Sequence, residues 1–322
     1  MIRFILRRLA ASLLLLYLVL TATFFLIHLA PGSPVNLLVE DRRVPAEKRE
    51  NLKRLYGLDR PLPEQYVRWL AATARGNWGT SFTYQRPVAS VVLDAVPATL
   101  LLAFAGLLVE QAAGVALGIA AARRPGSAAD HVIRIGSLLL FSLPAFWVGL
   151  MAILLFALVW PVLPPGHMYS IGAEDLGPGA RLLDLLRHLV LPALVVGLSQ
   201  AGSVARYVRA SVLDVLGQEY IRAARAKGIS ERRVVWAHAL RNALPPVIQV
   251  MALSLGALLS GLLIAEVVFS WPGIGRLTFE AIQGRDYPLI LATTAFSAVV
   301  TLLANLLADI LHALADPRVR GA

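Results

Sequence analysis

Long apolar stretches dominate the sequence, and short polar segments separate them. Six windows approach or exceed the roughly 20 apolar residues that cross a bilayer. Their ranges are Leu9–Ala30, Ala98–Ala122, Ile135–Trp160, His188–Ala205, Asn242–Ala265 and Tyr287–Ala308. Because the windows lack the two-residue alternation of barrel strands, they predict helices, which satisfy their own backbone hydrogen bonds in lipid. The sequence therefore predicts an all-α integral membrane protein with six transmembrane helices.

Details within the windows refine this prediction. The first window contains 22 residues without Asp, Glu, Lys or Arg. It is longer than the roughly 7–15 apolar residues of a signal peptide, so we interpret it as an uncleaved first transmembrane helix. The fourth window is short, and we expect its helix to continue past Arg206. Pro144 and Pro192 are expected to kink the helices that contain them.

Composition supports a membrane location. Hydrophobic residues make up 57% of the chain and charged residues only 16%, whereas soluble domains carry roughly 25% charged residues. No cysteine is present, which excludes disulfides and thiolate metal sites. The formal net charge of +10 is typical of basic cytoplasmic loops in a membrane protein.

The distribution of basic residues predicts the orientation. If the N-terminus is cytoplasmic, the inner segments carry 16 Lys and Arg residues, against 4 in the short outer loops. Basic residues concentrate on the cytoplasmic side of short loops. We therefore expect a multi-pass protein of the cell (inner or plasma) membrane with both termini in the cytoplasm.

Three regions follow from the window positions. Residues 1–30 form the N-terminus and the first transmembrane helix, 31–95 an extracytoplasmic segment, and 96–322 a core domain with a cytoplasmic loop at 206–241. Segment 31–95 is too long for a simple connector. We expect Tyr66, Trp69, Trp78 and Phe82 to bury a small core there, so that the segment forms an outer cap.

The inner loop carries the most informative local pattern. Gln218 to Lys227 predicts a short helix with small alanine side chains, and Gly228 suits the left-handed position that closes a helix. Two alternatives are a solvated basic loop and a DNA-binding helix-turn-helix. The loop joins two membrane spans and cannot easily enter a DNA groove, so we expect no nucleic-acid partner. Small residues favour close approach of another protein surface.

This loop resembles the coupling segment of permeases of ATP-binding-cassette importers. Ala223, Ala224 and Gly228 match an Ala-Ala-x-x-x-Gly core, and Leu244-Pro245 match a downstream pair. Arg222 replaces the usual Glu, which is typical of the dipeptide, oligopeptide and nickel branch. Further matching segments, in the expected order, are LAPGSPVNLL, YGLDRPLPEQYVRWL, GNWGTSF, FSLPAFWVGL, VFSWPGIGRL, RDYP and DPRVR. The N-terminal pattern is similar to that of the first, or B-type, permease of the pair.

The resemblance implies a type I importer permease fold, with a small extracytoplasmic insert between helices 1 and 2. It implies a translocation path shared with a second homologous permease, two ATP-binding-cassette ATPase subunits that carry ATP and Mg, and an extracytoplasmic solute-binding protein. The expected cargo is a di- or oligopeptide, with nickel, glutathione or another small solute as the alternative. The implied ATPase-coupling residues are Glu219, Tyr220, Arg222, Ala223, Ala224, Arg225, Ala226, Lys227 and Gly228.

Motifs that the sequence lacks narrow the function further. The chain contains no G-x-x-x-x-G-K-[ST] phosphate loop and no H-E-x-x-H, and its six histidines show no ligand spacing. We therefore expect no catalytic, cofactor or metal residues, and no enzyme activity. An ion-coupled secondary transporter is the rival, although the internal repeats common in such proteins are not evident. A receptor or scaffold without transport is a further alternative.

Polar and aromatic residues in and beside the spans are candidates for the translocation path or a gate. Ionisable groups at membrane depth are costly and often functional. These candidates are Glu110, Asn305 and Asp309 in the spans, and Trp271, Pro272 and Gly273 in the WPGIG loop. The alternative is helix-to-helix hydrogen bonding for Asn305 and Asp309 and interfacial anchoring for Trp271. Gly114 and Gly118 form a G-x-x-x-G pair that favours close helix packing.

Overall fold

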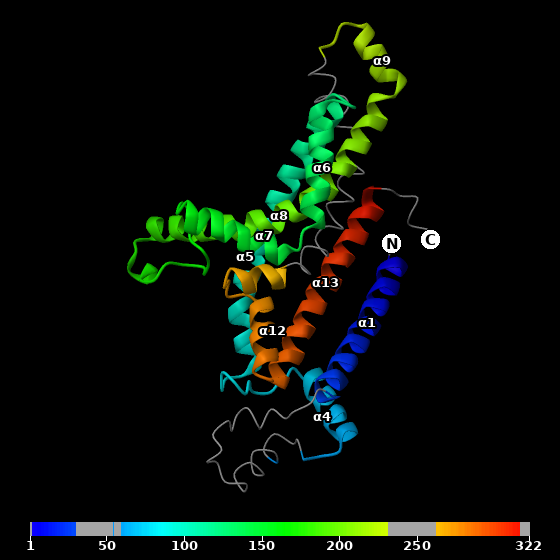
Figure 1. The fold of residues 1–322 in the computed structure, drawn as a ribbon. Coiled ribbons are helices and arrows are strands. Elements are labelled where there is room, and N and C mark those ends of the chain that lie inside the picture. The colour runs from blue at the N-terminus through cyan, green and yellow to red at the C-terminus, as the bar shows by residue number, and fades with distance from the viewer. Residues whose placement is uncertain (1, 30–53, 55–58, 231–261, 316–322) are drawn as a thin grey trace. The chain divides into compact units, whose positions relative to one another are not determined.

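A computed structural model describes residues 2–29, 54, 59–230 and 262–315 of the chain, with side chains excluded at 2–5 and 311–315. Helices make up most of this part (Figure 1). The long ones are α1 (Ile2–Leu29), α5 (Val88–Arg123), α8 (Pro178–Leu216) and α13 (Tyr287–Ala315). The shorter ones are α4 (Leu62–Ala74), α6 (Ala128–Ser142), α7 (Ala145–Ile153), η1 (Leu154–Val159), η2 (Ala173–Asp175), α9 (Glu219–Ala226) and α12 (Ile274–Gln283).

The four long helices are each apolar and long enough to cross a membrane. They correspond to the first, second, fourth and sixth predicted windows, and α8 continues past Arg206 as expected. The third window differs from the prediction of a kinked span. Its two halves, α6 and α7 with η1, meet at an angle of 101°. Most of the fifth window lies outside the described residues, together with Leu244 and Pro245.

Proline chemistry explains the break in the third window. Pro144 is the N-cap of α7, and Leu143 before it is extended, with φ −77° and ψ 137°. A residue that precedes proline is driven out of the helical region, and proline itself donates no amide hydrogen bond. The sequence therefore ends one helix and begins another where we had expected a kink.

The described chain divides into two compact units, each built from segments far apart in sequence. One unit comprises residues 1–8, 98–272 and 301–322, and the other comprises 9–97 and 273–300. The first unit has its main core where α5 and α8 pack with residues 262–271. The second has its core where residues 82–95 pack with α12 and the start of α13.

In the second unit, Asp286 joins the loop at residues 81–83 to the start of α13. Its buried carboxylate accepts hydrogen bonds from Ser81 Oγ at 2.5 Å, Thr83 N at 2.9 Å and Leu289 N at 3.2 Å. The last bond caps the N-terminus of α13. The carboxylate of Asp286 in the RDYP segment therefore binds the GNWGTSF segment through Ser81 and also caps the helix that follows RDYP.

The aromatic residues of segment 31–95 fall into two groups rather than the single core we expected. Tyr66 and Trp69 on α4 pack on Phe24 of α1, with ring centroids 5.3 and 5.2 Å away. Trp78 and Phe82 join the core formed with α12 and α13. Residues 59–95 are therefore folded, while 30–53 and 55–58 lie outside the described residues.

Within the first unit, glycines let α5 and α8 approach closely. A Cβ added at Gly118 would lie 2.7 Å from the backbone oxygen of Ala205 and 2.6 Å from Val208 Cβ. Gly114 meets Val204 at 2.5 Å in the same way, and Gly197 on α8 meets the Gly106 oxygen at 2.6 Å. The prediction that the G-x-x-x-G pair packs closely is confirmed, and Gly197 adds a third close contact between α5 and α8.

We predict that Gly118→Ala destabilises the chain by about 1–3 kcal/mol, because the new methyl group overpacks against backbone. Gly136→Ala is the matched control, since a Cβ on that α6 glycine meets nothing within 4 Å. Helix propensity alone makes the control neutral or more stable by about 1 kcal/mol. Thermal unfolding in detergent measures both, and equal unfolding temperatures for the two variants would contradict the close contact.

Candidate functional site

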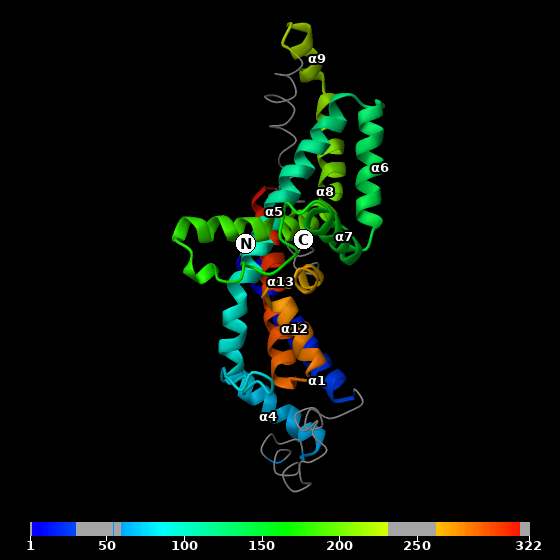
Figure 2. The same cartoon turned by 60° about the vertical axis from the view of Figure 1, so that its left-hand side comes forward.

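The predicted coupling residues form a short helix after α8. Helix α9 spans Glu219–Ala226, and its N-cap residue, Gln218, has an extended backbone. Figures 1 and 2 both show α6 lying along α8, with α9 beyond the end of α8. Gly217 ends α8, so a single break separates the long helix from the short one. The sequence therefore located this helix correctly to within a residue or two.

Two side chains of α9 point back into their own chain. Ile221 is completely buried and Ala224, three residues later, is 9% exposed. Residues three apart share one face of a helix. The exposed members of the predicted set are Glu219, Tyr220, Arg222, Ala223, Arg225, Ala226, Lys227 and Gly228. Ala224 therefore packs internally, so the surface open to another protein includes Ala223 and Ala226 instead.

Gly228 closes α9 in the predicted way. Its φ of +77° lies in the left-handed region, which costs little for glycine and more for other residues. The amide of Ile229 donates to the Ala224 oxygen at 3.3 Å, and the amide of Gly228 donates to the Arg225 oxygen at 2.9 Å. These bonds cap carbonyls that the helix end would otherwise leave open.

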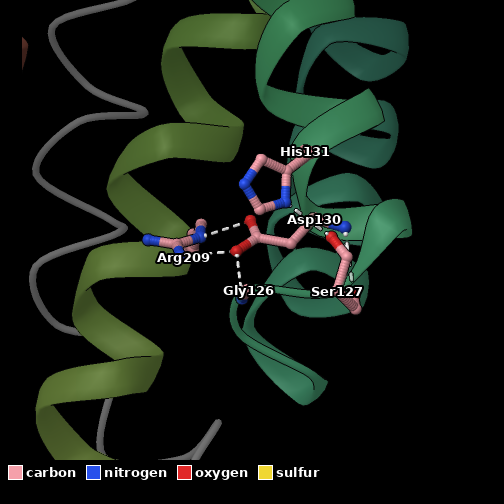
Figure 3. Close-up of polar contacts among 5 residues, drawn as sticks. All are labelled: Gly126, Ser127, Asp130, His131 and Arg209. Carbon is pink, nitrogen blue, oxygen red and sulfur yellow. Dashed lines mark hydrogen bonds and ion pairs between the residues drawn. The ribbon is translucent and has the colours of Figure 1, made fainter.

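An ion pair that we did not predict ties α8 to α6 (Figure 3). Arg209 Nε and Nη2 each lie 2.8 Å from an oxygen of Asp130, in a bidentate arrangement. Asp130 is completely buried, and its Oδ2 also accepts from Gly126 N at 2.9 Å. Ser127 caps α6 by accepting from Asp130 N at 3.3 Å. The carboxylate thus joins the α5–α6 turn to α8, ten positions before α9 begins.

Part of this arrangement was visible in the sequence. Ser127-Ala-Ala-Asp130 follows Pro125-Gly126 and resembles the serine and acidic pair that begins many helices. Arg209 lies 79 residues away from Asp130. Its choice as the partner depends on tertiary packing, so local pattern could not reveal it.

The WPGIG loop is anchored rather than free at its tryptophan. Trp271 is completely buried, and its Nε1 donates to the Ala98 oxygen of α5 at 2.8 Å. Glu266, also buried, accepts from Thr99 Oγ1 at 2.7 Å, and its backbone oxygen accepts from Trp271 N. Pro272 is exposed and Gly273 is buried. The interpretation of Trp271 as an interfacial anchor is therefore wrong, because the side chain does not reach the surface.

The polar residues of the spans lie in three different settings. Glu110 on α5 is 1% exposed, between the Gly106 and Gly114 contacts with α8. Asp309 on α13 forms an ion pair with Arg8 of α1 at 2.9 Å, which fits the helix-to-helix alternative. Asn305 is exposed, Asp309 is half-buried and Glu110 is buried. A path-lining role for these residues stays a prediction.

No group of three or more His, Asp or Glu side chains within the described residues is arranged to hold a metal ion. The polar clusters that do occur are paired in ways that hold segments together. Asp286, Asp130 and Glu266 each accept hydrogen bonds from a segment distant in sequence. In the described part of the chain, these three buried carboxylates therefore connect segments of the fold.

Comparison with known proteins addresses the whole chain. Residues 114–321 match the family model described as binding-protein-dependent transport system inner membrane component, and residues 1–103 match the model for the N-terminal part of such membrane components. The chain is 40% identical to the di/tripeptide transport system permease protein of Pseudomonas aeruginosa (strain UCBPP-PA14). It is 37% identical to the oligopeptide transport system permease protein of Bacillus subtilis (strain 168) and 35% identical to the dipeptide transport system permease protein of Escherichia coli (strain K12).

Each of these three alignments covers 99% of this chain and 99% of the relative. Matches of this extent favour a permease over the two alternatives, an ion-coupled transporter and a scaffold. A permease of this family is a membrane component and not itself an enzyme. The chain belongs to the family of binding-protein-dependent transport system inner membrane components, the multi-pass permeases of ATP-binding-cassette importers, as its motifs predicted.

Proposed function

We propose that this chain is the B-type permease subunit of an ATP-driven peptide importer, and that α9 is where an ATPase subunit docks. The two-sided surface of α9 is the main support. Ile221 and Ala224 secure one side of the helix to its own chain, while Ala223 and Ala226 present small side chains outward. A helix held in this way can transmit a movement of the bound partner to α8.

The proposed assembly follows the family pattern. A second permease completes the translocation path, two ATPase subunits bind ATP and Mg, and an extracytoplasmic binding protein delivers the cargo. The sequence supports separate ATPase subunits because it contains no phosphate loop. Di- or oligopeptides are the proposed cargo, since the three relatives described above are all peptide permeases by name. Nickel is the less favoured alternative.

We propose that both termini are cytoplasmic. The excess of basic residues in the segments assigned to the inner side supports this orientation. The Arg8–Asp309 ion pair adds to it, because it places the N-terminal part of α1 beside the C-terminal part of α13. Both chain ends then lie on one side of the membrane, the side to which the basic α9 loop also belongs.

The Asp130–Arg209 pair gives α9 a rigid base in this proposal. A bidentate arginine–carboxylate pair fixes orientation as well as distance. Arg209 lies on α8 and Asp130 at the start of α6, so a displacement of the end of α8 is transmitted to a second membrane helix. The pair therefore connects the proposed docking helix to the spans by a second route.

We predict that Ala223→Trp abolishes ATPase docking and peptide uptake, because a bulky side chain holds the two proteins apart. Because Ala223 is exposed, membrane insertion and thermal stability should stay unchanged. The measurement is co-purification of the ATPase subunits with the tagged permease, followed by dipeptide uptake into proteoliposomes that contain the full importer.

Two further variants make this test specific. Ala128→Trp places the same side chain on an exposed position of α6 and should leave docking intact. Ala224→Trp fills a buried position, so it is expected to lower stability as well and does not isolate docking. Normal assembly and uptake by Ala223→Trp would remove α9 as the docking site.

We predict that Arg209→Lys weakens coupling without blocking docking. Lysine keeps the charge but cannot make the two parallel hydrogen bonds to Asp130. The expected loss of stability is about 1–3 kcal/mol, since bonds to charged groups contribute that much. ATPase subunits should still co-purify, while uptake per ATP hydrolysed falls. An unchanged ratio of uptake to hydrolysis would show that the pair has no part in transmission.

We propose that the WPGIG loop gates the outer side through its backbone turn at Pro272, with buried Trp271 as the fixed hinge. In a Pro272→Cys variant, cross-linking to the partner permease is expected to depend on the nucleotide state of the importer. Position 272 is suited to this test because it is exposed, whereas Gly273 is buried. The same cross-linking yield with and without nucleotide would reject the gate.

A further inference from the structure

A basic pocket lies between α6 and α8, close to the Asp130–Arg209 pair. It has a volume of about 610 Å³ and opens to the surface. Its lining residues are His131, Arg134, Ile135 and Leu138 of α6, and Arg206 and Arg209 of α8. The four α6 positions follow the 0, 3, 4, 7 spacing of one helix face, and the two α8 positions are three apart. Apart from Arg209, the lining residues have no part in the proposed function described above.

The polar side of the pocket carries excess positive charge. Arg209 is neutralised by Asp130, which is completely buried beneath it. Arg134 and Arg206 are exposed, and none of the lining residues is acidic. His131 donates from Nδ1 to the Ser127 oxygen at 2.9 Å, which orients its ring (Figure 3). Two guanidinium groups in an open pocket provide a site for a phosphate, which arginine binds well.

The α6 side of the pocket also carries apolar residues, and these continue along the helix. Ile135, Leu138, Leu139 and Phe141 are each more than half exposed. The Arg206 guanidinium lies over the Phe141 ring, 5.9 Å from its centre. Helix α6 belongs to a segment apolar enough for a membrane. An open charged end joined to an exposed apolar strip matches the shape and chemistry of a lipid rather than those of a free anion.

We propose that this pocket binds the phosphate headgroup of an anionic phospholipid, with its acyl chains along Ile135, Leu138 and Phe141. Basic pockets between transmembrane helices are sites of this kind for acidic lipids. The close contact of Gly202 with Ser137, where an added Cβ would lie 2.8 Å from the Ser137 oxygen, joins α6 to α8 farther along the pair. The bound lipid thus sits beside the helix pair that supports α9 and stabilises it.

The test compares the intact chain with a double variant, Arg134→Gln with Arg206→Gln, which leaves Asp130 and Arg209 untouched. Phosphatidylglycerol is added to delipidated protein, and binding is measured by native mass spectrometry and by the shift in unfolding temperature. The double variant is expected to bind about 30-fold more weakly, at about five-fold for each basic side chain near an acidic lipid. Phosphatidylcholine and inorganic phosphate should give no shift with either protein.

Two control variants make the result decisive. Arg181→Gln with Arg187→Gln removes the same charge from exposed positions elsewhere on α8 and should bind phosphatidylglycerol normally. Arg134→Lys with Arg206→Lys keeps the charge, and it should retain most of the binding. Equal stabilisation by inorganic phosphate would overturn the proposal in favour of a simple anion site. Unchanged lipid binding by the glutamine variant, with loss of the partner permease or ATPase subunits, would overturn it in favour of a protein interface.

Discussion

Close approach of α5 and α8 is the constraint on which the first unit depends. In a bilayer the hydrophobic effect gives helices little reason to associate, so they associate through close packing and polar contacts. Gly114, Gly118 and Gly197 remove side chains where these helices meet, and backbone oxygens then lie within about van der Waals distance of the opposite helix. The core residues of α8 and 262–271 pack around this seam. A methyl group added at any of the three glycines would clash with a backbone oxygen of the other helix.

Buried carboxylates join distant segments at three points. Asp286 connects the 81–83 loop to α13, Glu266 connects the end of the fifth window to Thr99, and Asp130 connects the α5–α6 turn to α8. In each case a carboxylate with little or no exposure accepts hydrogen bonds from another segment, which is how a buried charge is tolerated. Van der Waals packing holds the helices together but does not fix their relative orientation, whereas hydrogen bonds are directional. The three carboxylates therefore fix the positions of connecting segments that helix packing alone would not fix.

The sequence was sufficient for the parts that depend on period and composition. The four long spans, the continuation of α8, the glycine seam and the left-handed Gly228 follow from local rules, and the structure contains them. The break at Pro144 was underestimated, because proline shows that a helix changes direction without showing by how much. The sequence left Trp271 open between a gate and an interfacial anchor, since the hydrogen bond that buries it joins positions 173 residues apart. The burial of Ala224 could not be read from the sequence for the same reason, because the side of α9 that packs internally depends on tertiary contacts.

The Asp130–Arg209 pair has a built-in polarity. Asp130 lies in the first turn of α6, where the amide groups of the helix N-terminus carry partial positive charge, and it also accepts from Gly126 N. An arginine at position 130 would face those same amide donors, so exchanging the two residues could not recreate the joint even though the net charge of the pair would be the same. The connection between α6 and α8 therefore works in one sense only, with the acid on α6 and the base on α8.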